Sequence, residues 1–120
     1  MLKGQGWKEI TDHPEMIRSW GRYEVLDSGD GYKIMRVLLK RGNYLRPQMH
    51  LHRTEHCVVI RGTAQVKIGN ETFLLHEGGS AFVPKKTVHV LGNYTDSEVE
   101  IIEVENMDYL EEDDIVVYDS

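Results

Sequence analysis

The sequence predicts a single all-β domain, built as a sandwich or a barrel. The chain has 120 residues, a length that fits one domain. Segments with strand-like patterns recur about every ten residues, a spacing typical of sandwiches and barrels. Turn residues separate these segments, and Gly69-Asn70 is a two-residue hairpin signal. No strand–helix–strand unit is visible, which argues against an α/β fold.

The strands are expected in quick succession from residue 23 onward. They cover, in chain order, residues 23–26, 32–40, 57–62, 63–69, 71–78, 80–84 and 98–105. Ahead of them, residues 12–20 are the stretch that fits a helical turn, with Asp12 as its N-cap. We therefore divide the chain into a short N-terminal extension, residues 1–22, and a β domain, residues 23–120.

The last predicted strand, EVEIIEVE, is irregular. Val99 and Ile101 share one face, and Ile102 and Val104 share the other. The alternation of apolar and acidic residues slips by one position between the two isoleucines. A slip of this kind predicts a β-bulge or a strand that changes sheets.

The net charge of −6 is unevenly distributed. Residues 1–86 contain all 14 lysines and arginines and 9 of the 20 acidic residues, whereas residues 87–120 contain the other 11 acids. Such an acidic part repels phosphates, so nucleic acid is not an expected partner. No run of eighteen apolar residues is present, so no membrane partner is expected either. The single cysteine and the absence of an N-terminal apolar signal core predict a cytoplasmic protein.

A short window of the sequence and one later histidine contain side chains that can bind a metal ion. The window is QMHLHRTEH, residues 48–56, and the later residue is His89. Imidazole nitrogens and carboxylate oxygens that converge from several strands hold divalent metals. One possible ligand set is Gln48, His50, Glu55 and His89. A competing set is His50, His52 and His56.

The first ligand set requires a bend in the chain between His50 and Glu55. Gln48 and His50 are even-numbered and Glu55 is odd-numbered, so a bend must absorb one residue between them. The polar segment LHRT, residues 51–54, is suited to that bend. In this register His52 lies in or near the bend, and His56 faces away from Glu55.

Two longer motifs resemble those of the cupin superfamily. Gly42-x5-Gln48-x-His50-x4-Glu55-x6-Gly62 resembles the first cupin motif, and Gly78-x5-Pro84-x-Lys86-x2-His89-x3-Asn93 resembles the second, with Lys86 where a glycine is usual. The resemblance implies a double-stranded β-helix, or jelly roll, with the metal in the barrel mouth. It favours the set Gln48, His50, Glu55 and His89. The cofactor implied is one divalent metal ion: zinc, manganese, iron, cobalt or nickel.

The match is closer to one branch of that superfamily. Residues 18–37, 48–64 and 100–116 are similar to the cupin part of type II mannose-6-phosphate isomerases, which is often fused to a mannose-1-phosphate guanylyltransferase. The chain differs from the family at Cys57, where tryptophan is usual, and lacks several basic residues of the family.

The resemblance implies an aldose–ketose isomerase that acts on a sugar phosphate. Such a reaction needs a metal at the enediolate oxygen and a base that moves the proton, for which His52 and Lys86 are candidates. Arg46 and Arg61 are candidate donors to the phosphate. A second hypothesis is a non-catalytic, metal-containing module that binds a sugar or another small molecule. A third is an iron-dependent oxygenase, because two histidines and a carboxylate can hold Fe(II).

Apolar residues on both faces of two strands predict a homodimer. Residues 57–60 and 100–104 are apolar on both faces, although only one face of each sheet meets the core. The surplus needs cover from the N-terminal segment or from a second subunit. Because cupins are often dimers, we expect a two-fold homodimer with the outer sheet face or the N-terminal segment at its interface.

Overall fold

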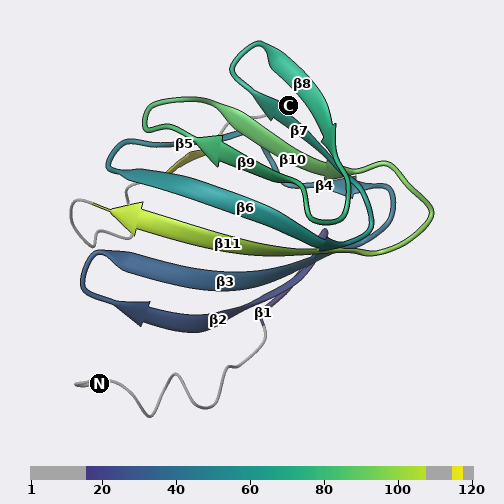
Figure 1. Ribbon diagram of the computed structural model, residues 1–120, viewed down its shortest axis with the longest axis horizontal. Coiled ribbons are helices and arrows are strands. Elements are labelled where there is room, and N and C mark those ends of the chain that lie inside the picture. The colour runs from purple at the N-terminus through teal and green to yellow at the C-terminus, as the bar shows by residue number, and fades with distance from the viewer. Residues whose placement is uncertain (1–15, 108–114, 118–120) are drawn as a thin grey trace.

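The computed structural model describes residues 16–107 and 115–117, and within them it confirms the all-β fold. Two antiparallel sheets face each other across the interior (Figure 1). No helix among the described residues is long and apolar enough to span a membrane.

The first sheet carries the longest strands. Its order is β1-β2-β3-β11-β6-β9. The bounds are Met16–Arg18 for β1, Gly21–Gly29 for β2, Tyr32–Leu39 for β3, Val99–Met107 for β11, Arg53–Arg61 for β6 and Ser80–Val83 for β9. In Figure 1, β2, β3, β11 and β6 lie side by side in this order.

The second sheet is built from shorter strands. Its order is β12-β5-β10-β7-β8, and β4 pairs with β10. The bounds are Ile115–Val117 for β12, Gln48–His50 for β5, His89–Asn93 for β10, Ala64–Ile68 for β7, Glu71–Leu75 for β8 and Asn43–Tyr44 for β4. From β5 to β11 the chain crosses repeatedly between the two sheets, so residues of β5 and β10 face residues of β6 and β11.

The helical turn expected over residues 12–20 is wrong where the structure describes it. Met16–Arg18 form β1, which turns back at once to pair with β2. Gly21 permits this return, because its φ is +150° and a Cβ atom there would lie 2.0 Å from the carbonyl oxygen of Leu38. The part before residue 16 lies outside the described residues. The first sheet therefore includes residues that the sequence assigned to the extension.

The predicted hairpin at Gly69-Asn70 is confirmed, since it joins β7 and β8 with Ile68 opposite Glu71. A bulge lies next to the position predicted for it, but its extra residue is Ile60 on β6 and not a residue of β11. The register of β11 shifts against β6 between Glu100 and Ile101, whereas its pairing with β3 runs without interruption. The alternation of β11 therefore continues, and the side chains of residues 99, 101, 103 and 105 are all buried.

The core occupies one end of the space between the sheets. Leu39, Val59, Val99 and Ile101 are each at most 1% exposed. Asn93 is fully buried beside them and donates hydrogen bonds from Nδ2 to the carbonyl oxygens of Leu39 and Ser97. Because the bond to Leu39 joins the second sheet to the first, this polar group contributes to closing that end.

Candidate metal centre

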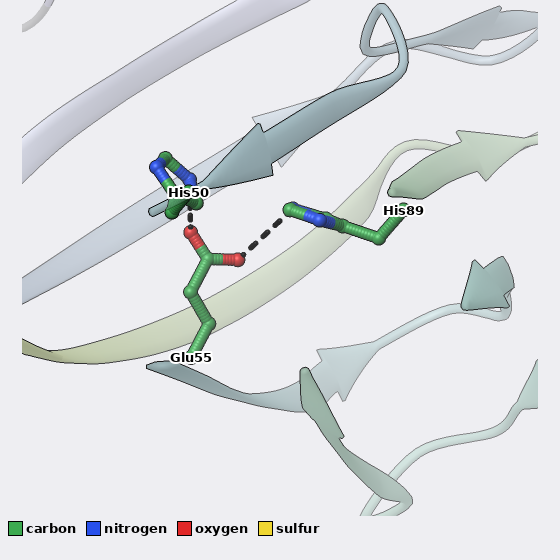
Figure 2. A group of neighbouring side chains, drawn as sticks. All are labelled: His50, Glu55 and His89. Atoms are coloured by element: carbon green, nitrogen blue, oxygen red, sulfur yellow. Dashed lines mark ion pairs between the residues drawn. The ribbon is translucent and has the colours of Figure 1, made fainter. Parts of the chain in front are cut away.

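Three side chains from three strands meet in the interior (Figure 2): His50 from the end of β5, Glu55 from β6 and His89 from the start of β10. Nε2 of His50 lies 3.0 Å from Oε2 of Glu55, and Nε2 of His89 lies 3.2 Å from Oε1. One ligand atom from each residue lies within 4.8 Å of the others. The predicted bend falls at residues 51–52, which brings Glu55 to the same side as His50.

The donor set fits a divalent metal ion. Both ring nitrogens of His50 are buried and lack a hydrogen-bond partner among the described residues. Nε2 of His50 is thus in contact with the Glu55 carboxylate without the geometry of a hydrogen bond. A metal bound about 2.0–2.2 Å from each donor would satisfy these atoms. A buried imidazole without a partner would otherwise be costly.

The loop between β9 and β10 positions both histidines. The Thr87 carbonyl oxygen lies 3.3 Å from Nδ1 of His89, and a proton donated there leaves Nε2 with its lone pair directed at the site. The amide of Lys86 donates a hydrogen bond of 2.7 Å to the carbonyl oxygen of His50. Lys86 adopts a φ of 60°, a left-handed conformation in which a glycine would be less strained.

The charges of the three residues support one another. Burial opposes the ionisation of Glu55, but the close contacts with the imidazoles of His50 and His89, at 3.0 and 3.2 Å, outweigh it and hold the pKa of the carboxyl below its usual value. Burial also opposes the protonation of His89, and contact with Glu55 nevertheless raises the pKa of its imidazole. The site therefore holds an ionised carboxylate at neutral pH, as a metal ligand requires.

A second buried group borders the centre, and the sequence analysis did not identify it. Glu103 and Glu105 point inward from β11, and a carboxylate oxygen of each lies within 4.8 Å of one on Glu55. Glu105 pairs with Arg53 at 3.1 Å and with Lys33 at 3.8 Å. Strand parity counted from Ile101 without a slip would have placed both acids inside.

Burial governs the ionisation of these acids. It raises the pKa of Glu103 well above its usual value, and the neighbouring charges of Glu55 and Glu105 raise it further. Burial and Glu55 also raise the pKa of Glu105, against the opposing effects of Lys33 and Arg53. The polar interior thus contains one carboxylate held by histidines and two carboxyls with weakened acidity.

A cavity of about 330 Å³ connects the centre to the surface. Its lining includes His50, Glu55, His89, Glu103 and Glu105. Gln48 also lines it, directly opposite His89 in the pairing of β5 with β10. The structure thus places all four residues of the first ligand set around one cavity and brings three of them into one cluster; ligation by Gln48 stays a prediction.

The other four predicted site residues do not belong to the cluster of His50, Glu55 and His89. Arg46 lines the cavity. His52 lies in the bend, Lys86 is exposed in the β9–β10 loop, and Arg61 is exposed and paired with Glu100 at 2.9 Å. None of these three lines the cavity. Their catalytic and substrate roles stay predictions.

The competing ligand set is not brought together. The side chain of His56 is exposed on the outer face of β6 and packs against Phe82, with 4.7 Å between the ring centroids. Since Glu55 is buried beside it, the two residues face opposite sides of the strand. His50, His52 and His56 therefore do not form a metal site in this structure.

Comparison with known families assigns the chain to one of them. A family described as "Mannose-6-phosphate isomerase C-terminal" matches residues 5–120. The chain belongs to this family. The alginate biosynthesis protein AlgA of Pseudomonas aeruginosa is 44% identical over 114 residues, covering 95% of this chain and 24% of that protein. A mannose-1-phosphate guanylyltransferase of Salmonella muenchen is 43% identical over 115 residues, covering 96% and 24%. The chain thus spans about a quarter of the length of these relatives.

Solved structures confirm the fold. A structure of Bacillus subtilis oxalate decarboxylase, described by its Mn(II) centres, superposes with a TM-score of 0.77 at 18% identity. The match covers 90% of this chain and 30% of that chain. The predicted cupin jelly roll is therefore confirmed.

Proposed function

We propose that the chain is a metal-dependent isomerase of a sugar phosphate, with mannose 6-phosphate as the first substrate to test. The observation that carries this proposal is the buried cluster of His50, Glu55 and His89 at the base of a cavity. Membership of the mannose-6-phosphate isomerase C-terminal family supports the choice of substrate class.

The ligands in this proposal are His50, Glu55 and His89, with Gln48 as the fourth. A bound divalent ion would stabilise the negative charge that develops on the carbonyl oxygen during isomerisation. Mn²⁺ is the first ion to test, because the donors are nitrogen and oxygen atoms and the structurally similar oxalate decarboxylase is described by its Mn(II) centres. Zinc, iron, cobalt and nickel follow.

The reaction also needs a group that moves a proton between adjacent carbons. Among the described residues, Glu103 lines the cavity next to Glu55, whereas His52 and Lys86 do not line it. We therefore assign the proton transfer to Glu103. Its weakened acidity suits a group that must both accept and return a proton.

A coupled assay with the Mn²⁺-loaded chain tests this function. We expect conversion of mannose 6-phosphate to fructose 6-phosphate, lost in His50→Ala. We expect Glu103→Gln to lower kcat by about 10²–10⁴-fold while metal content stays unchanged. Absence of turnover in a metal-loaded, folded protein would contradict the proposal. Binding without turnover would then favour the non-catalytic module, and oxygen uptake with bound iron would favour the oxygenase.

We also propose a homodimer, which is supported by apolar side chains on the outer face of the first sheet. Ile60 on β6 and Phe82 on the edge strand β9 are 42% and 47% exposed. Light scattering at micromolar concentration tests this proposal. A mass near 13.9 kDa that does not change on concentration would contradict it. The cytoplasmic location stays a prediction.

A further inference from the structure

An outer hollow adjoins the cavity at the side of the sandwich, where the edge strand β1 of the first sheet lies near β4, β5 and β12 of the second. Its volume is about 670 Å³, and it extends between β1, β4, β5 and β12. Four residues line both spaces: Arg18, Trp20, Arg46 and Gln48. These shared side chains place the outer hollow directly beside the cavity that contains the metal centre.

The two spaces differ in charge. The cavity is lined by the carboxyls of Glu55, Glu103 and Glu105. Besides the two arginines that it shares with the outer hollow, it is lined by Lys33 and Arg53, which both pair with Glu105. The outer hollow is lined by two guanidinium groups, Arg18 and Arg46, and contains no carboxylate among the described residues that line it. Its remaining described lining residues are Ser19, Trp20, Asn43, Tyr44, Gln48 and Val117. The cations Lys33 and Arg53 of the cavity thus lie beside a carboxyl, whereas the two guanidinium groups that line the outer hollow favour an anionic group there.

The first of these arginines is held in place by aromatic rings. The Arg18 guanidinium lies over the Tyr23 ring, 5.3 Å from its centroid, and Nη2 donates a hydrogen bond of 3.3 Å to the Tyr23 hydroxyl. Trp20 stacks on the same ring, with 6.2 Å between centroids and 20° between planes. Such a stack pre-orders the guanidinium and leaves Trp20 lining both spaces.

We propose that the outer hollow is an anion subsite that binds the phosphate of a sugar phosphate through Arg18 and Arg46, with Trp20 against the sugar ring. The inference rests on the proposed function, because it orients the substrate with its reacting carbons toward His50, Glu55 and His89. Guanidinium groups bind phosphate through paired, charge-assisted hydrogen bonds. The carboxyls that line the cavity and the guanidinium groups that line the outer hollow thus match a ligand with a neutral polyol end and an anionic end.

Fluorescence titration of the metal-loaded 120-residue chain tests the subsite without requiring turnover. The chain has two tryptophans, so Trp7→Phe makes Trp20 the sole reporter. The probes are mannose 6-phosphate, mannose and inorganic phosphate. We expect mannose 6-phosphate to bind at least 10-fold more tightly than mannose. Arg18→Gln and Arg46→Gln should each weaken its binding about 10-fold or more and leave mannose binding unchanged.

The matched control is Arg22→Gln on β2. Arg22 pairs with Glu98 at 3.3 Å and lines neither space, so its loss should leave the affinity for mannose 6-phosphate unchanged. Arg18→Lys keeps the charge and should retain part of the affinity. Circular dichroism and metal content establish that each variant is folded. If Arg18→Gln does not fold, Arg46→Gln alone carries the test.

The outcomes separate this inference from the proposed function. Arginine-dependent binding of mannose 6-phosphate without turnover would sustain the subsite and contradict the isomerase. Turnover with an unchanged KM in both arginine variants would sustain the isomerase and contradict the subsite. Equal affinity for mannose and mannose 6-phosphate would also overturn the subsite.

Discussion

The two ends of the barrel interior are built from the same strands but from opposite residue types. On β11, Val99 and Ile101 point into the apolar end, and Glu103 and Glu105 point into the polar end. On β6 the buried positions run from Arg53 and Glu55 to Cys57 and Val59. We use "apolar end" for the region of Leu39, Val59, Val99 and Ile101. We use "polar end" for the region of His50, Arg53, Glu55, His89, Glu103 and Glu105.

The contrast separates stability from function within one fold. Burial of apolar side chains is the main favourable contribution to folding, whereas buried carboxyls oppose it unless they are paired or bind a metal. The apolar end can therefore stabilise the strands that carry the polar end. Substitutions at the two ends should accordingly change the free energy of unfolding in opposite directions.

Truncation at the apolar end should have the largest effect on stability. Leu39 is fully buried, and Leu39→Ala should lower the free energy of unfolding by about 3–5 kcal/mol through lost burial and the cavity that remains. Urea denaturation measures this change. The control is Leu74→Ala on β8, where the side chain is 56% exposed and the change should stay within about 0.5 kcal/mol. Equal effects at the two positions would contradict the assignment of the core.

Neutralising one acid at the polar end should stabilise the metal-free protein. Because the pKa of Glu103 is raised in the folded state, the wild-type chain loses stability as pH rises above the carboxyl's unfolded value. Glu103→Gln removes that loss. It should raise the free energy of unfolding by about 1 kcal/mol or more at pH 8 and by less at pH 5. Denaturation in EDTA at both pH values measures this, and a variant less stable than wild type at pH 8 would contradict it.

The strained residue behind His50 should give the smallest effect. Lys86→Gly relieves a left-handed conformation at φ 60° and keeps the amide that donates to the His50 carbonyl. The gain should be about 0.5 kcal/mol, because glycine also loses more backbone entropy on folding. Lys85→Gly provides the control: its backbone is not left-handed, so the variant should be destabilised. A lower melting temperature for Lys86→Gly would show that the lysine side chain contributes more than the strain costs.

Some features of the fold and of the candidate site could be predicted from local sequence patterns, and others could not. The seven predicted strands, the Gly69-Asn70 hairpin and the bend before Glu55 follow from local patterns, and the structure contains them, as β2, β3, β6, β7, β8, β9 and β11 for the strands. Local patterns failed at residues 16–18, where pairing with β2 overrides a weak helical signal.

The sequence analysis missed Glu103 and Glu105 for one physical reason. The slip predicted in β11 does not occur, because the extra residue of the bulge is Ile60 on β6. β11 pairs with β3 without interruption, so Glu103 and Glu105 remain inside. Two acids in a strand pattern ordinarily indicate a solvent-exposed face. Their buried position depends on the pairing with β3 and on the cations Lys33 and Arg53, which lie far away in sequence.

Whether His50, Glu55 and His89 bind a metal ion at the polar end can be decided by measuring the metal content of the protein. The chain and its variants are purified, loaded with Mn²⁺ and desalted, and bound metal is measured by plasma mass spectrometry. We expect one ion per wild-type chain, none in His50→Ala or His89→Ala, and one in His52→Ala, whose side chain lies outside the cavity. Metal retained in folded His50→Ala and His89→Ala, or lost only in His52→Ala, would contradict this expectation.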